Sequence, residues 1–174
     1  MKNPLENFEI KSVKFCEDLS DETNCFNAKL YHKGKLVGVA KNSGNGGETS
    51  VSPIPKSMNS KEINELSKSL SDYKWVLSHN MDNSLSIETV ADLLVEQHLF
   101  LKAIKKGFKS KTVGMIDKEK FMTLNCLVKL TPELLKKVKD KYPTATILNE
   151  LTDQEILGEF TKLGEYEFPE FKAA

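Results

Sequence analysis

The hydrophobic period changes along this chain, and that change restricts its fold more than any other feature. Within residues 8–15 and 26–31 apolar residues recur at about every second position, as in strands with one buried face. Between Ile87 and Ile104 they recur at intervals of three and four, as in an amphipathic helix. Because strands and helices are segregated, we predict an α+β fold rather than a doubly wound parallel sheet.

The first third of the chain predicts an N-terminal antiparallel β-hairpin region. Residues 8–15 form a strand-like run with one slip in the alternation, which indicates a β-bulge. Residues 26–31 and 36–40 alternate around a turn that contains a glycine, the pattern of a hairpin. A Gly-rich segment, Asn42–Gly47, follows, and two prolines shortly after it interrupt regular structure.

The middle of the chain predicts central helices. Ser60 is expected to cap a short first helix, and Ser86 to begin the longest one, which ends at Gly107. Between them, residues 72–84 are expected to be irregular and to be anchored to the core by Trp75.

The last third predicts a second hairpin and C-terminal helices. Residues 112–116 and 122–130 flank a polar turn, and the second run alternates strictly, as a half-buried strand does. Thr131 precedes a proline and an acidic residue, so it begins a helix, which Pro143 ends. The pattern Thr152-x-x-Glu155 is a capping box that begins the final helix.

A length of 174 residues predicts a single domain spanning 1–174, with a β-rich lobe 1–56 and a helical and mixed lobe 57–174 as the alternative. No apolar run approaches the ~20 residues that cross a membrane, and no hydrophobic segment follows the first lysine as in a secretory signal. Three cysteines at irregular spacing fit reduced thiols better than a disulfide framework. We therefore expect a cytoplasmic protein without a membrane partner.

The charges are balanced overall but unevenly placed. Lys102–Lys141 holds 12 lysines and 4 acidic residues, whereas Asn149–Phe171 holds 7 acidic residues and 1 lysine. All 25 basic residues are lysine, and the chain lacks the planar arginine fork that reads phosphate and guanine. Sequence-specific nucleic-acid recognition is therefore disfavoured, and weak, salt-sensitive contact through lysine stays an alternative.

The Gly-rich loop is the first candidate binding site, because glycines let backbone N–H groups converge on an anion or let a partner approach closely. It lacks the Lys-Ser/Thr ending of a phosphate-binding loop and the strand–loop–helix setting of a dinucleotide fold. A bent connection without a ligand is the alternative. The candidate residues are Asn42, Gly44, Asn45, Gly46 and Gly47.

A lysine run around Phe108 is the second candidate, with Lys105, Lys106, Lys109 and Lys111 as its binding residues. Lysines with an interleaved aromatic residue can contact a partner or follow a nucleic-acid backbone. Lysines near a helix C-terminus also have a structural reason, since they complement the helix dipole.

No catalytic set can be assembled from the sequence. Cys16, Cys25 and His32 come nearest to a metal cluster, but their spacing matches no zinc signature and free thiols are expected instead. His98 lies on the apolar stripe of the long helix and is expected to be packed and hydrogen-bonded. We predict no catalytic residue, no metal and no cofactor, and expect that the protein is not an enzyme.

Three segments of the first third have distinctive patterns: Ser20–Ala28 (Ser-x-Glu-Thr-x-Cys-Phe-x-Ala), Gly34–Gly38 (Gly-Lys-x-x-Gly) and Asn42–Gly47 (Asn-x-Gly-x-Gly-Gly). In these segments the chain resembles a group of small, mostly uncharacterised proteins of bacterial genomes, plasmids and phages. The C-terminal segments 141–143 and 147–149 are also similar to that group. Ser43 and Asn45 stand where the group's loop has aspartate and histidine, so acid–base or metal chemistry by those two side chains does not carry over.

The resemblance implies a mobile-element setting, in which small proteins often act by binding a host factor. We therefore predict a non-enzymatic binding module, a phage or prophage accessory protein that binds and modulates a host defence protein. One alternative is a nucleotide or phosphate-ligand binding protein, or a hydrolase, that uses the Gly-rich loop. Another is a weak lysine-mediated nucleic-acid binder. The oligomeric state stays open.

Overall fold

The computed structural model describes residues 3–76, 83–108, 110–167 and 170–173. It has the predicted α+β fold, with four helices and several antiparallel sheets in this part of the chain. In chain order the elements are η1 (Pro4–Asn7), β1 (Phe8–Phe15), η2 (Glu17–Leu19), β2 (Phe26–His32), β3 (Lys35–Asn42), β4 (Ser50–Ser52), α1 (Ser60–Ser71), β5 (Tyr73–Val76), β6 (Asn83–Ser84), α2 (Ile87–Gly107), β7 (Thr112–Asp117), β8 (Lys120–Asn125), α3 (Pro132–Lys141), β9 (Thr146–Ile147), η3 (Leu148–Glu150), α4 (Asp153–Lys162) and β10 (Glu170–Ala173).

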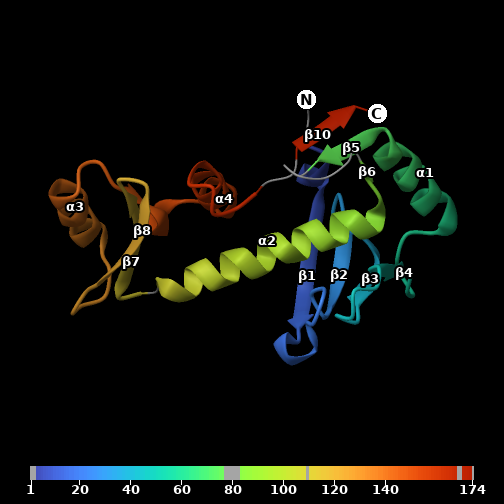
Figure 1. Cartoon of the computed structure of the whole chain (residues 1–174), viewed down its shortest axis with the longest axis horizontal. Coiled ribbons are helices and arrows are strands. Elements are labelled where there is room, and N and C mark those ends of the chain that lie inside the picture. The colour runs from blue at the N-terminus through green and yellow to red at the C-terminus, as the bar shows by residue number, and fades with distance from the viewer. Residues whose placement is uncertain (1–2, 77–82, 109, 168–169, 174) are drawn as a thin grey trace. The chain divides into compact units, whose positions relative to one another are not determined.

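The chain divides into two compact units, Met1–Glu96 with Pro169–Ala174, and Gln97–Phe168. The division falls inside α2, which Figure 1 shows as one continuous helix. The chain length predicts a single domain over residues 1–174, with a boundary after residue 56 as the alternative. The number of domains stays a prediction.

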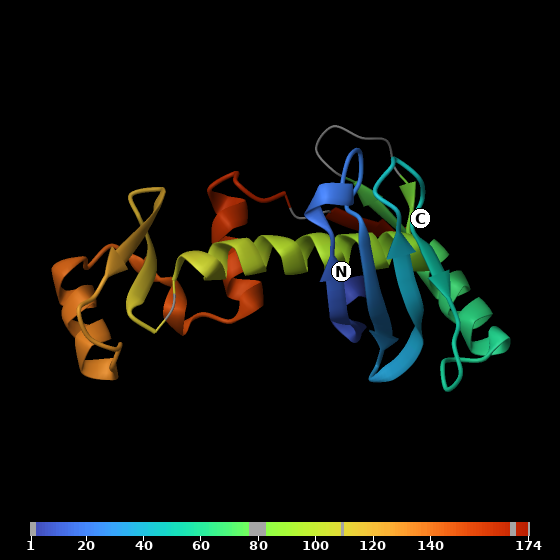
Figure 2. The same ribbon diagram turned by 90° about the horizontal axis from the view of Figure 1, so that it is seen from below.

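A four-stranded antiparallel sheet in the order β1-β2-β3-β4 forms much of the first unit. Phe26, Ala28 and Leu30 of β2 are buried and alternate with exposed residues, which confirms the predicted two-residue period. The first half of α2 lies across one face of this sheet (Figures 1 and 2) and adds the fully buried Val90 and Ala91 to the core.

Strand β1 contains the predicted β-bulge. Its register against β2 shifts between Lys11 and Lys14, so that β1 has one more residue than its partner over this stretch. Ser12 takes up the extra residue with a φ of 55°, in the left-handed region. β1 is also an edge strand of its sheet, and both lysines are exposed there.

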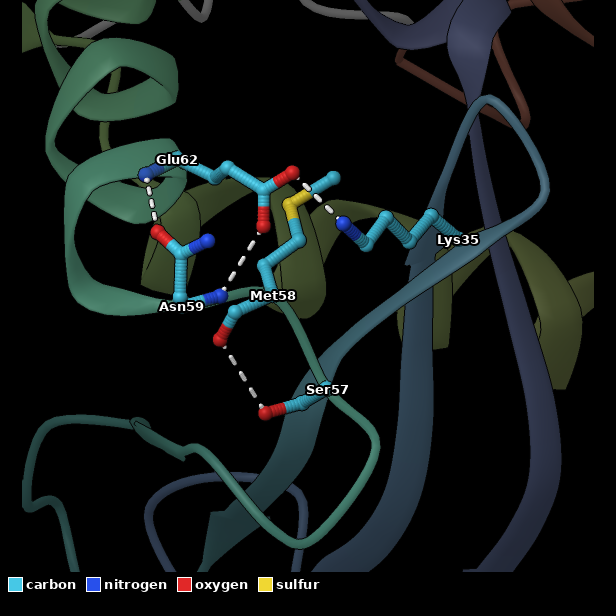
Figure 3. Close-up of polar contacts among 5 residues, drawn as sticks. All are labelled: Lys35, Ser57, Met58, Asn59 and Glu62. Carbon is cyan, nitrogen blue, oxygen red and sulfur yellow. Dashed lines mark hydrogen bonds and ion pairs between the residues drawn. The ribbon is translucent and has the colours of Figure 1, made fainter.

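Helix α1 begins with a capping box (Figure 3). The Asn59 side chain accepts the N–H of Glu62 at 3.0 Å, and the Glu62 carboxylate accepts the N–H of Asn59 at 3.0 Å. Glu62 also accepts a hydrogen bond from Lys35 of β3 at 2.5 Å. The prediction that Ser60 is the cap is wrong, because Asn59 has the extended backbone that a cap needs and Ser60 is already helical.

A three-stranded sheet in the order β10-β5-β6 completes the first unit. The prediction that residues 72–84 are irregular is wrong for β5 and β6, and residues 77–82 lie outside the described part of the chain. β5 pairs with β6 and also with β10, through partners such as Trp75 and Phe171. Trp75 is only half-buried, and its indole N–H has no hydrogen-bond partner in the described part of the chain. The sequence gives no sign of the β5–β10 pairing because the two strands are short and lie far apart in the chain.

Helix α2 confirms the predicted long helix and ends at Gly107. His98 is exposed, so the prediction that it is packed is wrong: in this turn of α2 the neighbouring Gln97 is the buried residue. Over the described ranges, no helix is both long enough and apolar enough to cross a membrane.

The second unit contains a three-stranded antiparallel sheet in the order β8-β7-β9, together with α3 and α4. The predicted hairpin, the Thr131 cap and the capping box of Thr152 and Glu155 are confirmed. Phe160 of α4 is fully buried, and its ring lies 5.3 Å from that of Phe100 and 5.4 Å from that of Phe121, between centroids. Phe160 is therefore central to the core of this unit.

We predict that Phe160→Ala lowers the free energy of unfolding by about 3–5 kcal/mol, because it leaves a cavity among packed aromatic rings. Urea unfolding followed by circular dichroism measures the change. Leu127→Ala is the control, since Leu127 is 97% exposed and its loss should change stability by no more than about 0.5 kcal/mol. Equal effects of the two substitutions would contradict this assignment of the core.

Candidate functional site

The Gly-rich loop joins β3 to β4 and closes around the side chain of Asn42, the last residue of β3. The amide oxygen accepts hydrogen bonds from the Thr23 hydroxyl and the Gly44 N–H, both at 2.9 Å. The amide nitrogen donates to the Gly47 carbonyl and the Thr49 hydroxyl, both at 3.0 Å. All four hydrogen-bonding positions of this buried amide are thus used within the chain.

The carbonyl of Gly44 accepts three backbone N–H groups from the segment that precedes β2. Asp21 and Glu22 donate at 3.0 Å, and Thr23 donates at 3.2 Å. Gly44 has a φ of +89°, and a Cβ there would lie 1.9 Å from the carbonyl oxygen of Leu19. Only glycine fits this position, and the backbone that it approaches so closely is the chain's own.

The other residues of this loop are more open. Gly46 also has a positive φ, of +76°, and a Cβ there would meet the flexible carboxylate of Glu22. Asn45 and Gly47 are exposed, and a Cβ on Gly47 would meet nothing within 4 Å. These three residues and the exposed Ser43 therefore form the accessible part of the loop, and a ligand or partner contact there stays a prediction.

A further hydrogen bond connects this loop to helix α2. The buried hydroxyl of Thr49, which accepts from Asn42, donates to the carboxylate of Asp92. Burial raises the pKa of Asp92 above its ordinary value; the Thr49 hydrogen bond opposes that rise, and the charge of Glu88 adds to it. The sequence contains one signal for this connection, the aspartate Asp92 within the apolar stripe of α2. Asp92 is not among the candidate residues predicted from the sequence.

A cavity of about 270 Å³ lies beside Asp92. Its lining consists of three carboxylate and three hydroxyl side chains: Glu48, Thr49, Ser86, Glu88, Thr89 and Asp92. Among the described residues, no group of three or more histidine, cysteine, aspartate or glutamate side chains is arranged to hold a metal ion.

The fold brings two of the three residues that come nearest to a metal cluster together, but not the third. The N–H of Cys16 donates to the carbonyl of Cys25 at 3.0 Å, near the start of β2. His32 lies at the opposite end of that strand, where its ring contacts Phe8 at 4.6 Å between centroids. Both cysteines are free thiols.

The lysine run belongs to the second unit, whereas the Gly-rich loop belongs to the first. Lys105 and Lys106 lie in the last turn of α2, and Lys105 pairs with Asp153 in the first turn of α4. Lys111 is exposed just before β7, and Lys109 lies outside the described residues. Of the described lysines of this run, Lys106 and Lys111 are exposed, and Lys105 is the one that is paired.

A segment that the sequence analysis missed, residues 126–130, lies beside Ser110 and Lys111. The Cys126 N–H donates to the Lys111 carbonyl at 2.7 Å, and the Leu130 N–H donates to the Ser110 carbonyl at 2.8 Å. Between these anchored ends, Leu127 is 97% exposed and Val128 is 62% exposed. We call residues 126–130 the apolar loop.

The prediction of a half-buried strand over residues 122–130 is therefore wrong beyond Asn125. That residue pairs with Thr112, the first residue of β7, so no partner strand continues past it. Without a partner strand the alternation no longer assigns side chains to faces, and Val128 is left exposed.

No family model matches this chain, and no curated protein or solved structure matches it either. The resemblance to small proteins of mobile elements therefore stays a prediction.

We predict that Asn42→Ala lowers the free energy of unfolding by about 2–4 kcal/mol, because it removes four hydrogen bonds and leaves the buried Gly44 N–H without its acceptor. Urea unfolding measures the loss, and hydrogen exchange should quicken at the amides of Asp21, Glu22 and Thr23. Asn45→Ala is the matched control, because this asparagine is exposed in the same loop. If both variants lose the same stability, Asn42 does not hold the loop.

We predict that Asp92→Asn becomes more stable relative to the wild type as the pH rises from about 4 to about 7. The unfolded chain ionises Asp92 near the ordinary value of about 3.9, but the folded chain keeps the proton to higher pH, since its pKa is raised. Ionising Asp92 therefore costs the wild type stability as the pH rises through that interval. Asparagine cannot ionise and still accepts from Thr49.

The measurement is the difference in unfolding free energy between Asp92→Asn and the wild type at several pH values. Parallel pH profiles for the two proteins would show that folding does not alter the ionisation of Asp92.

Proposed function

We propose that this chain is a protein-binding module without catalytic activity, and that the apolar loop is its main contact surface. The observation that supports the proposal is the pair Leu127 and Val128, both largely exposed on a segment held at both ends by backbone hydrogen bonds. Burying apolar surface of this kind contributes about 25 cal/mol per Å². A partner that covers these two side chains would gain that contribution.

The anchoring of the loop favours binding in a second way. Ordering a flexible loop on association costs conformational entropy, and a loop already held in place avoids part of that cost. The hydrogen bonds to Ser110 and Lys111 fix the backbone on both sides of the exposed pair. The loop therefore presents its side chains in a defined arrangement.

The charge around the apolar loop indicates the kind of partner. Lys111, whose carbonyl anchors the loop, and Lys129 within it are both exposed. A partner surface with an apolar depression and carboxylates at its rim would complement them, and such charges act mainly on association rate and specificity. The lysine run of the sequence analysis thus meets the apolar loop at Lys111.

We extend the proposal to the biological context in which the protein acts. The resemblance of segments 20–28, 34–38 and 42–47 supports a phage or prophage accessory protein that binds and modulates a host defence protein. Its three cysteines are free, which agrees with a place in the reducing cytoplasm.

The alternative of a nucleotide site or hydrolase at the Gly-rich loop is less well supported. An anion site of that kind needs backbone N–H groups that converge on the ligand. Three N–H groups do converge here, those of Asp21, Glu22 and Thr23, but their acceptor is the carbonyl of Gly44. The alternative of a weak nucleic-acid binder is supported by the lysines alone.

We predict that the tagged double variant Leu127→Ser/Val128→Ser captures at least tenfold less partner protein from a bacterial lysate than the tagged wild type does. The expected loss follows from the apolar area that the two side chains would bury. Quantitative mass spectrometry of the captured proteins measures it.

Leu19→Ser is the matched control, because Leu19 is also an exposed leucine, at 60%, but lies in the first unit. It should capture as much partner as the wild type. Equal capture by the double variant and the wild type would overturn the assignment of the apolar loop.

A further inference from the structure

A cavity of about 490 Å³ lies in the first unit, which does not contain the apolar loop. Its walls come from η1 and the start of β1, the β2–β3 turn, the second half of α1 and the start of β5. Sites for small molecules usually measure about 300–1,000 Å³ and combine an apolar surface with a few polar groups. This cavity has both properties.

The apolar part of the lining is formed by Phe8, Leu66 and Leu70, all at most 7% exposed. The ring of Phe8 packs against that of His32 with 4.6 Å between centroids. The core fixes these side chains, so the small part of each that lines the cavity is a preformed apolar wall for the hydrocarbon part of a ligand.

Lys33 supplies the positive charge of the lining. Its N–H donates to the Asn7 carbonyl at 2.7 Å, and its φ of 49° fixes it in the β2–β3 turn. Within the described residues, its ammonium group has no hydrogen bond or ion pair.

Asp72 supplies the negative charge, at an unusual place. It is the C-cap of α1, where the helix dipole is negative and a cation is favoured over a carboxylate. The described part of the chain gives this carboxylate no ion pair, with Lys33 or with any other residue. The carboxylate and the helix end together favour a bound cation.

The charges of the lining also exclude some ligands. Burial and the neighbouring charge of Lys33 lower the pKa of His32, so its imidazole is neutral at physiological pH. One ammonium and one carboxylate then remain. A nucleoside polyphosphate, with several negative charges, would meet a single lysine and an opposing aspartate, whereas a ligand with one charge of each sign would meet both partners.

We propose that this cavity binds a free amino acid with an apolar side chain. The carboxylate of the ligand pairs with Lys33, and its ammonium group pairs with Asp72 at the C-terminal end of α1. The ligand's side chain packs on Phe8 and the two leucines of α1. This small-molecule site is independent of the proposed protein contact, because it uses no residue of the apolar loop.

Isothermal titration of the full chain with L-phenylalanine, L-leucine, L-isoleucine and L-methionine tests the proposal. We expect saturable binding of at least one of them. If L-phenylalanine binds, two derivatives test the charges: N-acetyl-L-phenylalanine lacks the ammonium group, and L-phenylalaninamide lacks the carboxylate. Each should bind at least tenfold more weakly than L-phenylalanine. If another amino acid binds, its own N-acetyl and amide derivatives are used.

Two variants test whether Lys33 and Asp72 bind the charged groups of the ligand. Lys33→Asn and Asp72→Asn should each weaken binding of the amino acid at least tenfold, with circular dichroism unchanged. Lys56→Asn is the control, because Lys56 is an exposed lysine that also has a positive φ, of 73°. It should bind as the wild type does.

The proposal would be overturned if none of the four amino acids binds at a concentration of 10 mM. A dissociation constant on the order of 10 mM is the weakest that we would assign to a site. Binding that survives both Lys33→Asn and Asp72→Asn would overturn the proposal as well. Stabilisation by ATP without any effect of amino acids would show that the charge argument is wrong.

Discussion

The amide of Asn42 is the interaction on which the first unit depends. Its four hydrogen bonds close the Gly-rich loop, attach it to the segment before β2 through Thr23, and attach it to Thr49. Thr49 in turn donates to Asp92 of α2, so one amide links the sheet to the helix that covers it. The segment that most resembles a ligand site in the sequence therefore has a structural role, in which Gly44 is required by the approach of Leu19.

Local signals made most of the fold predictable. The hairpin turn, the Thr131 cap and the capping box at Thr152 each depend on residues within a few positions of one another, and all are present. The β5–β10 pairing could not be predicted, because Trp75 meets Phe171 and strands of four residues or fewer have too short a hydrophobic pattern to identify. Tertiary pairing determines such strands, whereas their own sequence does not.

The candidate sites were less predictable than the fold, for a physical reason in each case. The sequence identifies the glycines of the loop but not that the acceptor of the nearby N–H groups is the Gly44 carbonyl. The alternation through Val128 continues after the partner strand has ended, so it indicated burial where there is none. Lys33 and Asp72 look like ordinary turn and helix-end residues until the fold places both on one cavity.

The two edges of the four-stranded sheet have a consequence for how this protein meets others. An open strand edge offers unpaired backbone groups to which a foreign strand can add, the route to fibrillar aggregation and to recognition by strand addition. Here β4 is only three residues long, and β1 is interrupted at Ser12 between two exposed lysines. Both edges are therefore poor templates for the addition of a strand from another chain.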